Sequence, residues 1–394
     1  MKVTCLFSFL AFFCLQSNFG VATDPAGYLR PLAGLWIPGN DSQTGFGSGV
    51  AISKDGNTIV VGASGESAAY VYVKPAGGWQ TTKNYTAKLT NGRLGTPFGS
   101  NVAISGDTIV VSLYAGVKGA AYVFEKPDGG WQSTSNYQAV LHGTFETVGN
   151  MGNLAIDGDT IVAGSVATDD GVGFGVFVKP QGGWKSGTPT ALLTPSSLQY
   201  GQEFGPGLAI SGKTIIVGGF VDGLSTGSAF IYVRPSGGWV NSTETAYLTP
   251  SDGFQGEGFG NAVAIDGETA VVGAWENYQG NGAAYVFTEP SGGWHSMTET
   301  AKLTAHNSVF DSWFGYQVAV HGCVVAVGAE QQGSEYVYVE PTGGWQTTSN
   351  FSEELRSPPG LTILGYLTMG GTSLVTGVYG QTTHPSVVLV YGFD

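Results

Sequence analysis

Apolar residues in this chain come in short runs separated by glycine-rich turns. Residues 98–142 show the pattern clearly. The runs "NVAI" (101–104) and "DTIVVS" (107–112) flank a Ser105-Gly106 pair, which is typical of a two-residue hairpin turn. Two further runs follow, "AAYVFEK" (120–126) and "YQAVLH" (137–142). Valine, isoleucine and aromatic residues dominate these runs, which favours strands over helices. The pattern predicts a unit of four antiparallel strands.

The four-strand unit recurs seven times along the chain. Five copies start with a Phe-Gly pair, and the third and seventh carry the degraded pairs Met151-Gly152 and Leu364-Gly365. The starts are spaced by 50 to 55 residues. A period of about 50 residues with four strands per unit is the sequence pattern of a β-propeller, in which every unit forms one blade. We therefore predict an all-β fold, a seven-bladed β-propeller that forms a single domain over residues 24–394. The copies start near Phe46, Phe98, Met151, Phe204, Phe259, Phe314 and Leu364.

A second motif, Gly-Gly-Trp after a proline, occurs six times between the third and fourth strands of a unit. Proline ends the third strand, and glycine can adopt the positive φ that a chain reversal needs. Because the motif returns in every unit that has it, we interpret it as a structural turn whose tryptophan covers apolar surface. The alternative is a ring of aromatic platforms for sugars. The six turns end at Trp79, Trp131, Trp184, Trp239, Trp294 and Trp345.

The seventh unit lacks the Gly-Gly-Trp turn and a fourth strand. Its last run, "SVVLVYGFD" (386–394), matches a third strand, whereas "AGLWIPGNDSQTGFG" (33–47) aligns with the fourth strand and following loop at 301–315. We therefore expect the region Leu29–Ile37 to pair with Val387–Tyr391. Such pairing would close the ring and hide sheet edges that otherwise promote aggregation.

Composition and the N-terminus bear on where the protein acts. Residues 1–23 combine Lys2, an apolar run from Cys5 to Leu15 and small residues, which predicts a secretory signal peptide and a secreted protein. A buried strand or helix is the alternative. The formal charge of −14 argues against nucleic acid and anionic membranes as partners. No later apolar run is long enough to span a bilayer, so we expect a protein that is not membrane-embedded. We also expect a monomer.

The repeats resemble FG-GAP repeats, the units of the seven-bladed propellers in integrin α-subunit heads. The resemblance rests on Phe-Gly paired with Gly-Ala one strand later, as in Phe46-Gly47 with Gly62-Ala63 and Phe314-Gly315 with Gly328-Ala329. It implies a propeller used for binding or adhesion. Calcium-binding members carry a D-x-D-x-D-G loop between the first two strands. Here that connection is as short as "SGD" (105–107) or "DGD" (157–159), too few oxygens for a calcium cage. We therefore expect no metal in these loops and no cofactor.

Long loops that differ between blades mark the face on which a ligand would bind. The second-to-third and the fourth-to-next-first connections share this face and vary in sequence, whereas the two short turns on the other face are uniform. Aromatic rings beside acid and amide groups suit sugars or protein partners. Two adjacent loops contribute the strongest candidate cluster. Its members are Trp275, Glu276, Asn277, Tyr278, Phe310, Asp311 and Trp313.

No catalytic motif is recognisable, so we do not expect an enzyme. We expect a secreted binding protein that recognises extracellular carbohydrate or a cell-surface glycoprotein. A protein–protein adhesion module is the first alternative, and a hydrolase with paired acids on the variable face is the second. The chain also contains four Asn-x-Ser/Thr sequons, possible N-glycosylation sites if the host modifies exported proteins. They lie at Asn40, Asn84, Asn241 and Asn350.

Overall fold

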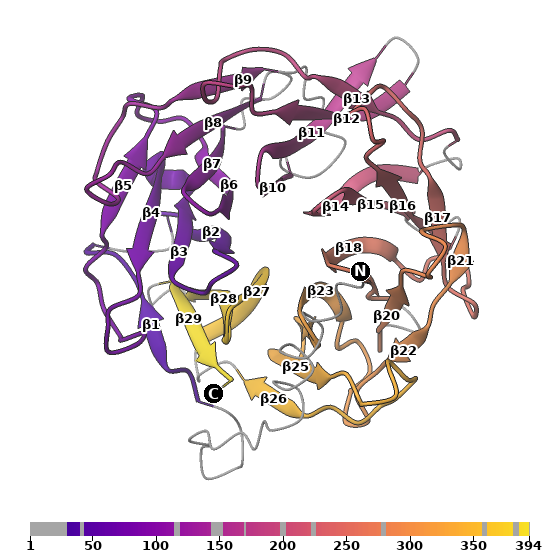
Figure 1. Ribbon diagram of the computed structural model, residues 1–394. Coiled ribbons are helices and arrows are strands. Elements are labelled where there is room, and N and C mark those ends of the chain that lie inside the picture. Colours follow the sequence, from indigo (N-terminus) through magenta and orange to yellow (C-terminus); the bar gives the residue numbers. More distant parts are fainter. Residues whose placement is uncertain are drawn as a thin grey trace, which may run out of the picture.

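The computed structural model describes residues 30–39, 43–113, 119–142, 153–168, 171–197, 202–221, 226–276, 281–356, 361–380 and 386–393. Seven sheets of antiparallel strands stand around a common axis, each forming one blade of a closed ring (Figure 1). The fourth sheet also takes up β21 (Met297–Thr298), a two-residue strand that pairs parallel with its outer strand. The only helical element in these ranges is a single 3₁₀ turn, Ser64–Glu66. The prediction of an all-β, seven-bladed propeller with four-stranded antiparallel blades is confirmed.

Each blade runs from an inner to an outer strand in chain order. The first blade contains β2 (Phe46–Ile52), β3 (Thr58–Ala63), β4 (Ala68–Val73) and β5 (Ala87–Thr90), and the second contains β6 (Phe98–Ser105), β7 (Thr108–Leu113), β8 (Ala120–Glu125) and β9 (Ala139–His142). The third contains β10 (Leu154–Asp157), β11 (Thr160–Thr168), β12 (Gly171–Val178) and β13 (Ala191–Leu193). The fourth contains β14 (Gln202–Ser211), β15 (Thr214–Val221), β16 (Ser228–Val233) and β17 (Ala246–Thr249). Blades five to seven contain β18 (Phe259–Asp266), β19 (Thr269–Ala274), β20 (Ala283–Thr288), β22 (Ala301–Leu303); β23 (Phe314–His321), β24 (Val324–Ala329), β25 (Ser334–Val339), β26 (Glu353–Arg356); and β27 (Leu361–Gly370), β28 (Ser373–Gly380), β29 (Val387–Gly392) with β1 (Ala33–Leu35).

The first strand of most blades begins at the Phe-Gly motif, several residues earlier than the sequence pattern predicted. In the first blade Phe46 pairs with Ala63, and the register shifts before Val50 pairs with Val61. Gly47 sits in this irregular stretch with φ 90°, a conformation that favours glycine. Phe46 is fully buried. The motif thus places an aromatic ring in the core and a glycine at a bulge. The predicted start of the third copy, Met151, lies outside the described residues.

Glycines bring neighbouring blades into backbone contact. A Cβ atom built on Gly62 would lie 2.0 Å from the carbonyl oxygen of Gly99 in the next blade. The same contact recurs between Gly273 and Gly315, where the distance would be 1.9 Å. Real Cβ atoms essentially never come closer than 3.0 Å to such an atom. The glycine of the Gly-Ala motif therefore allows one blade to pack on the Phe-Gly glycine of the next.

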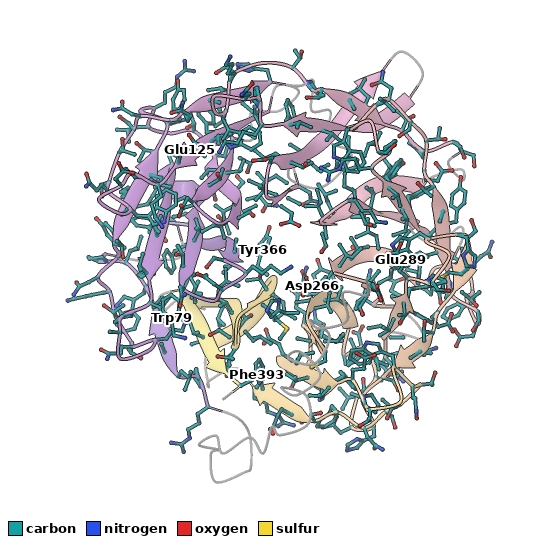
Figure 2. The ribbon with its side chains drawn as sticks, in the orientation of Figure 1. Trp79, Glu125, Asp266, Glu289, Tyr366 and Phe393 are labelled. Atoms are coloured by element: carbon teal, nitrogen blue, oxygen red, sulfur yellow. The ribbon has the colours of Figure 1, made fainter. Side chains whose placement is uncertain are left out.

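The Gly-Gly-Trp turns lie at the outer rim and do more than reverse the chain. Trp79 is 7% exposed, and the label in Figure 2 places it away from the axis. After the turn the chain crosses to the preceding blade, where Thr82 exchanges backbone hydrogen bonds with Gly34 and Trp36 around the outer strand β1. Equivalent parallel bridges join six of the seven seams between blades. Each outer strand so bridged has its free edge covered, which limits edge-to-edge aggregation.

The N-terminal strand supplies the outer strand of the seventh blade. β1 pairs antiparallel with β29, with Ala33 opposite Val390 and Leu35 opposite Val388. Both ends of the described chain therefore meet in one sheet, which is visible where indigo and yellow strands adjoin in Figure 1. Leu35 is fully buried in a core that also contains residues of the first blade.

Candidate functional site

Three aromatic rings gather where the fifth and sixth blades meet on the variable-loop face. Trp275 follows β19, Trp313 directly precedes β23, and Tyr316 lies within β23. The Trp275 and Trp313 rings meet edge-to-face with centroids 5.0 Å apart. Tyr316 lies 6.0 Å from Trp275 and 5.6 Å from Trp313. The structure therefore brings two of the predicted site residues into contact and adds Tyr316, which the sequence analysis did not select.

The loop that carries Trp313 has a strained backbone. Asp311 has φ 63° and Trp313 has φ 56°, in a region that side chains with a Cβ atom rarely adopt. The equivalent positions of the fifth blade are glycines, Gly256 with φ 78° and Gly258 with φ 72°. A non-glycine residue in this conformation costs roughly 1 kcal/mol. The sixth blade therefore keeps two side chains where a sister blade uses glycine.

Side chains of this loop project apolar surface into solvent. Phe310 is 71% exposed and Val309 is 55% exposed. The Trp313 indole donates a hydrogen bond from Nε1 to the Asp311 carboxylate at 2.8 Å, which fixes the ring relative to the loop. Strain, exposed apolar side chains and an oriented indole coincide in five consecutive residues. Such features concentrate at binding sites.

The remaining predicted site residues divide into two groups. Trp275 is half-buried against Gly258, and its indole Nε1 is buried without a hydrogen-bond partner in the part of the chain that the structure describes. Glu276 is also half-buried, and its backbone N–H donates to the Glu257 carbonyl at 3.1 Å. Asn277 and Tyr278 lie outside the described residues.

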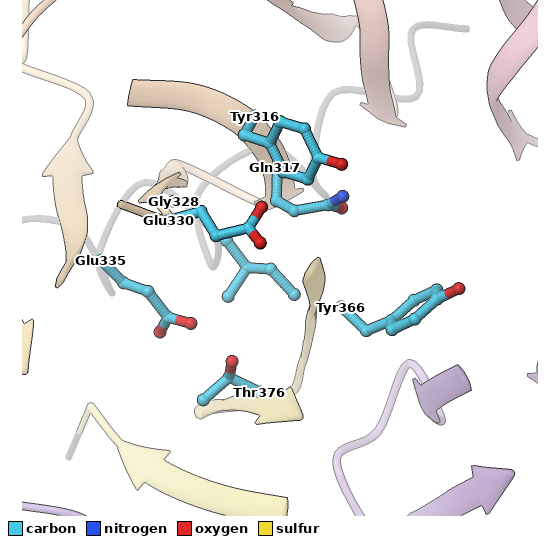
Figure 3. A pocket seen from close by; sticks show the side chains of 8 residues that line it. Tyr316, Gln317, Gly328, Glu330, Glu335, Tyr366 and Thr376 are labelled. Atoms are coloured by element: carbon cyan, nitrogen blue, oxygen red, sulfur yellow. The ribbon is translucent and has the colours of Figure 1, made fainter. Parts of the chain in front are cut away.

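A small pocket lies beside the aromatic cluster, in the seam between the sixth and seventh blades (Figure 3). The cavity volume of the pocket is about 10 Å³, which is room for about one water molecule. Tyr316 belongs to both the cluster and the pocket, so the two features are adjacent. The lining residues are Tyr316, Gln317, Gly328, Glu330, Glu335, Tyr366, Leu367 and Thr376.

Two carboxylates of this pocket are held away from water. Glu335 is 1% exposed, and a hydrogen bond with the Thr376 side chain only partly offsets the burial of its carboxylate. Glu330 is half-buried, and its Oε2 atom has no hydrogen-bond partner among the described residues. Burial raises the pKa of each carboxyl group to about 7. Nothing in the sequence patterning had marked either residue as a site.

On the opposite face, carboxylates of the short hairpin turns bind neighbouring blades. Asp157 accepts a hydrogen bond from the Gly212 backbone N–H at 2.6 Å, and Asp266 accepts one from Gly322 at 2.8 Å. Ser105 and Ser211 bind the next blade in the same way. These side chains therefore tie turn to turn around the axis, which is a structural role different from metal binding.

Asp266 makes a further contact across the ring, and Figure 2 shows it on the inner side. Lys54 Nζ of the first blade lies 2.9 Å from Asp266 Oδ1 of the fifth, two blades that are not neighbours. Burial alone would raise the pKa of Asp266. Hydrogen bonds from His321 and the Gly322 N–H, together with Lys54, outweigh burial and hold it well below the usual range. No cluster of three or more His, Cys, Asp or Glu side chains suited to a metal occurs within the described ranges.

The sequons fall at different places on the outer rim. Asn84 and Asn350 are exposed in the segments after the Gly-Gly-Trp turns. Asn241 is exposed as a residue, but its Oδ1 accepts a hydrogen bond from the Leu192 backbone N–H of the preceding blade at 2.9 Å. Asn40 lies outside the described residues.

The segments that match a known family recur with the blades. The sequence matches the FG-GAP repeat family over residues 85–124, 242–287 and 297–339. Each span runs from the outer strand of one blade to the third strand of the next. Together with the seven four-stranded blades, these matches show that the chain contains FG-GAP repeats and folds as a seven-bladed β-propeller. Among curated proteins, none matches the sequence significantly.

Solved structures resemble this chain in fold. The β-propeller domain of Cps50 (Swd1) from Myceliophteria thermophila has a TM-score of 0.56 at 12% identity, covering 87% of this chain and 96% of its own. The Dos1 propeller has a TM-score of 0.52 at 10% identity, covering 92% and 94%. Hsv2 from Kluyvelomyces marxianus has a TM-score of 0.50 at 9% identity, covering 87% and 96%. At such identities the likeness defines the fold alone.

A β-propeller with FG-GAP repeats is a general scaffold for protein interactions, and the ligand is set by the loops it carries. In the described part of the chain, no helix has the length and apolar character needed to cross a bilayer.

Proposed function

We propose that this protein is a secreted, non-enzymatic binding protein that recognises extracellular carbohydrate, free or on a glycoprotein, through the loop surface around Trp275 and Trp313. The observation that carries the proposal is the strained loop 309–313. Its backbone retains Asp311 and Trp313 at positions that are glycine in the fifth blade. Holding an indole and a carboxylate in place at a conformational cost favours recognition of a ligand over a role in stability.

Sugar rings suit this surface for two reasons. The C–H faces of a sugar pack on aromatic rings, and its hydroxyls donate to carboxylates. Here Phe310 offers an exposed ring, and the Asp311 carboxylate lies beside the Trp313 indole. The signal peptide predicted at residues 1–23 is consistent with extracellular ligands.

A protein partner is the second candidate function. Adjacent Val309 and Phe310 form an exposed apolar tip, and a sugar would not require the valine. This alternative corresponds to an adhesion module.

A glycan array probed with residues 25–394 tests the proposal. We expect selective binding that free sugar competes away, and we expect Phe310→Ala and Asp311→Gly to reduce it at least tenfold. Both positions are exposed, so folding should be kept, and circular dichroism checks this. Leu94→Ala is the matched control, because Leu94 is 92% exposed on an equivalent loop of the same face.

Each outcome has a meaning. Binding that Phe310→Ala leaves unchanged would place the sugar site elsewhere and refute the proposed surface. An array without signal would refute carbohydrate as the ligand. A cell-surface protein captured by the wild type and lost with Val309→Ala would then support adhesion.

A further inference from the structure

Glu335 is a buried acid at a position where other blades have a small apolar residue. It lies in β25, opposite Gly328 of β24. An alanine suffices for the fold at this position, because four other blades have one there. These residues are Ala69, Ala121, Ala229 and Ala284 of the first, second, fourth and fifth blades.

The carboxyl group of Glu335 is enclosed at the seam between the sixth and seventh blades. Glu335 is 1% exposed, and Figure 3 shows its carboxyl group beside Thr376 of β28. The Thr376 side chain supplies one hydrogen bond, and the pocket at this seam has room for about one water molecule. One hydroxyl group and so little space do not replace the hydration of a carboxylate. The uncharged, protonated form is therefore favoured here.

The neighbouring strand of the same blade brings no positive charge to this carboxyl group. Leu355 of β26 lies opposite Glu335, so both side chains are on one face of the sheet. Glu354 and Arg356 lie on the other face, where they form an ion pair of 2.8 Å with each other. Arg356 therefore does not compensate a charge on Glu335.

The other titratable groups at the seam are acids and phenols. Tyr391 of β29 interacts with Glu335, and Tyr316 of β23 interacts with Glu330. Burial raises the pKa of both tyrosines, so their hydroxyls stay neutral near pH 7. Glu330 lines the same pocket, and burial raises its pKa to about 7. Among the described residues that line the pocket, none is a cation.

The seam also lacks a close backbone contact that holds other blades together. In the first, fourth and fifth blades, a Cβ on Gly62, Gly218 or Gly273 would lie within 2.0 Å of a backbone oxygen of the next blade. A Cβ built on Gly328 would instead find its nearest atom at 3.4 Å, in the side chain of Gln317 of its own blade. The sixth and seventh blades are therefore less tightly packed at this level than those three pairs.

We propose that the seam between the sixth and seventh blades is a pH-sensitive joint, closed while Glu335 is protonated and loosened when Glu335 ionises. Ionisation places an uncompensated charge in an enclosed seam, and the charge is hydrated only when the blades separate and water enters. Tyr316 lines the same pocket and packs on Trp275 and Trp313, so the joint borders the candidate binding surface. The inference does not depend on which ligand that surface binds.

The direction of the pH dependence follows from the folded and unfolded states. Burial raises the pKa of Glu335 to about 7 in the folded protein, whereas a glutamate of the unfolded chain has a pKa of about 4.3. Below about pH 4 both states are protonated, and the group leaves stability unchanged. As pH rises from about 4 to about 7, only the unfolded chain releases its proton, so stability falls. Above about pH 7 both states are ionised and the loss is constant.

Urea unfolding of residues 25–394 at pH values from 4.5 to 8.5 tests the proposal. We expect the unfolding equilibrium constant of the wild type to rise with pH at least tenfold more than that of Glu335→Gln, whose amide has a similar shape and does not ionise. Glu330→Gln should remove a smaller part of this rise, because Glu330 is only half-buried. Glu268→Gln, exposed in the "DGE" turn, is the matched control and should follow the wild type.

Hydrogen exchange separates a loosened seam from a general loss of stability. At pH 8 we expect amide protection in β28 to be at least tenfold lower in the wild type than in Glu335→Gln, whereas β7 of the second blade should differ little. Glu335→Ala keeps the test decisive if Glu335→Gln does not fold, because four other blades have alanine there. The proposal is overturned if the wild type and the Glu335 variant have the same pH profile, if β7 and β28 lose protection equally, or if Glu268→Gln also flattens the profile.

Discussion

Gly273 and Gly328 occupy the same position in neighbouring blades, and replacing each by alanine should give opposite results. Both lie in the second strand directly before an alanine, and neither has positive φ, so the backbone tolerates alanine at each. The difference lies in the seam. A Cβ on Gly273 would lie 1.9 Å from the Gly315 carbonyl oxygen, whereas on Gly328 the nearest atom would be at 3.4 Å.

The distances set the expected size of the effect. At Gly273 the blades must separate by more than 1 Å to reach the 3.0 Å limit, and the atom in the way is backbone. Overpacking typically costs 1–3 kcal/mol, and because a whole strand must move we expect about 3 kcal/mol. Alanine also raises the free energy of unfolding by about 0.4–1 kcal/mol, because it has less conformational freedom than glycine in the unfolded chain. Gly273→Ala should therefore lose about 2 kcal/mol or more, and Gly328→Ala should be neutral or gain up to about 1 kcal/mol.

Calorimetric melting of the two variants beside the wild type measures the difference. Unfolding entropy of roughly 2 cal/mol/K per residue gives about 0.8 kcal/mol/K for a ring of about 360 residues that unfolds as one unit. Gly273→Ala should then melt about 3 °C below the wild type, and Gly328→Ala within about 1 °C of it. Equal shifts in the two variants would show that the seam contact does not control the packing of the blades.

Two further outcomes follow from other contacts. Asp266→Asn should destabilise the protein by roughly 2 kcal/mol at pH 7. Because the pKa of Asp266 is lowered in the folded protein, the stability advantage of the wild type should decline as pH falls below about 4, where the carboxyl group of the unfolded chain takes up its proton. Urea midpoints at pH 3, 5 and 7 measure this, and a stability difference independent of pH would contradict it. Leu35→Ala should cost about 2–4 kcal/mol, because Leu35 is fully buried where β1 completes the seventh blade, whereas Leu32→Ala, at 46% exposure, should cost under about 1 kcal/mol in the same urea titration.

The fold could be predicted because the same strand pattern occurs seven times in the sequence. One FG segment or one Gly-Gly-Trp turn is weak evidence, but repetition at 50 to 55 residues leaves few architectures. The bridges that each post-tryptophan segment makes to the preceding blade were not predicted. Thr82 and Gly34 are 48 positions apart in sequence, and no local pattern indicates that they pair.

The candidate site was only partly predictable. Trp275 and Trp313 were selected because two variable loops carry them, and their contact depends on how the fifth and sixth blades pack. Tyr316 was missed because it lies inside a strand. Glu335 could have been noticed by aligning "SEYVYV" with "AAYVYV", which places a carboxylate at an alanine position. That it faces Thr376 across a seam follows only from the assembled ring.

The bridges between blades have a consequence for how the ring comes apart. Parallel bridges after the tryptophan turns span six seams. A closed ring must part at one seam before any blade can leave it, and parting at any of these six seams breaks backbone hydrogen bonds between two blades. We expect the amide hydrogens that form the bridges, such as that of Thr82, to exchange with solvent only when the ring opens.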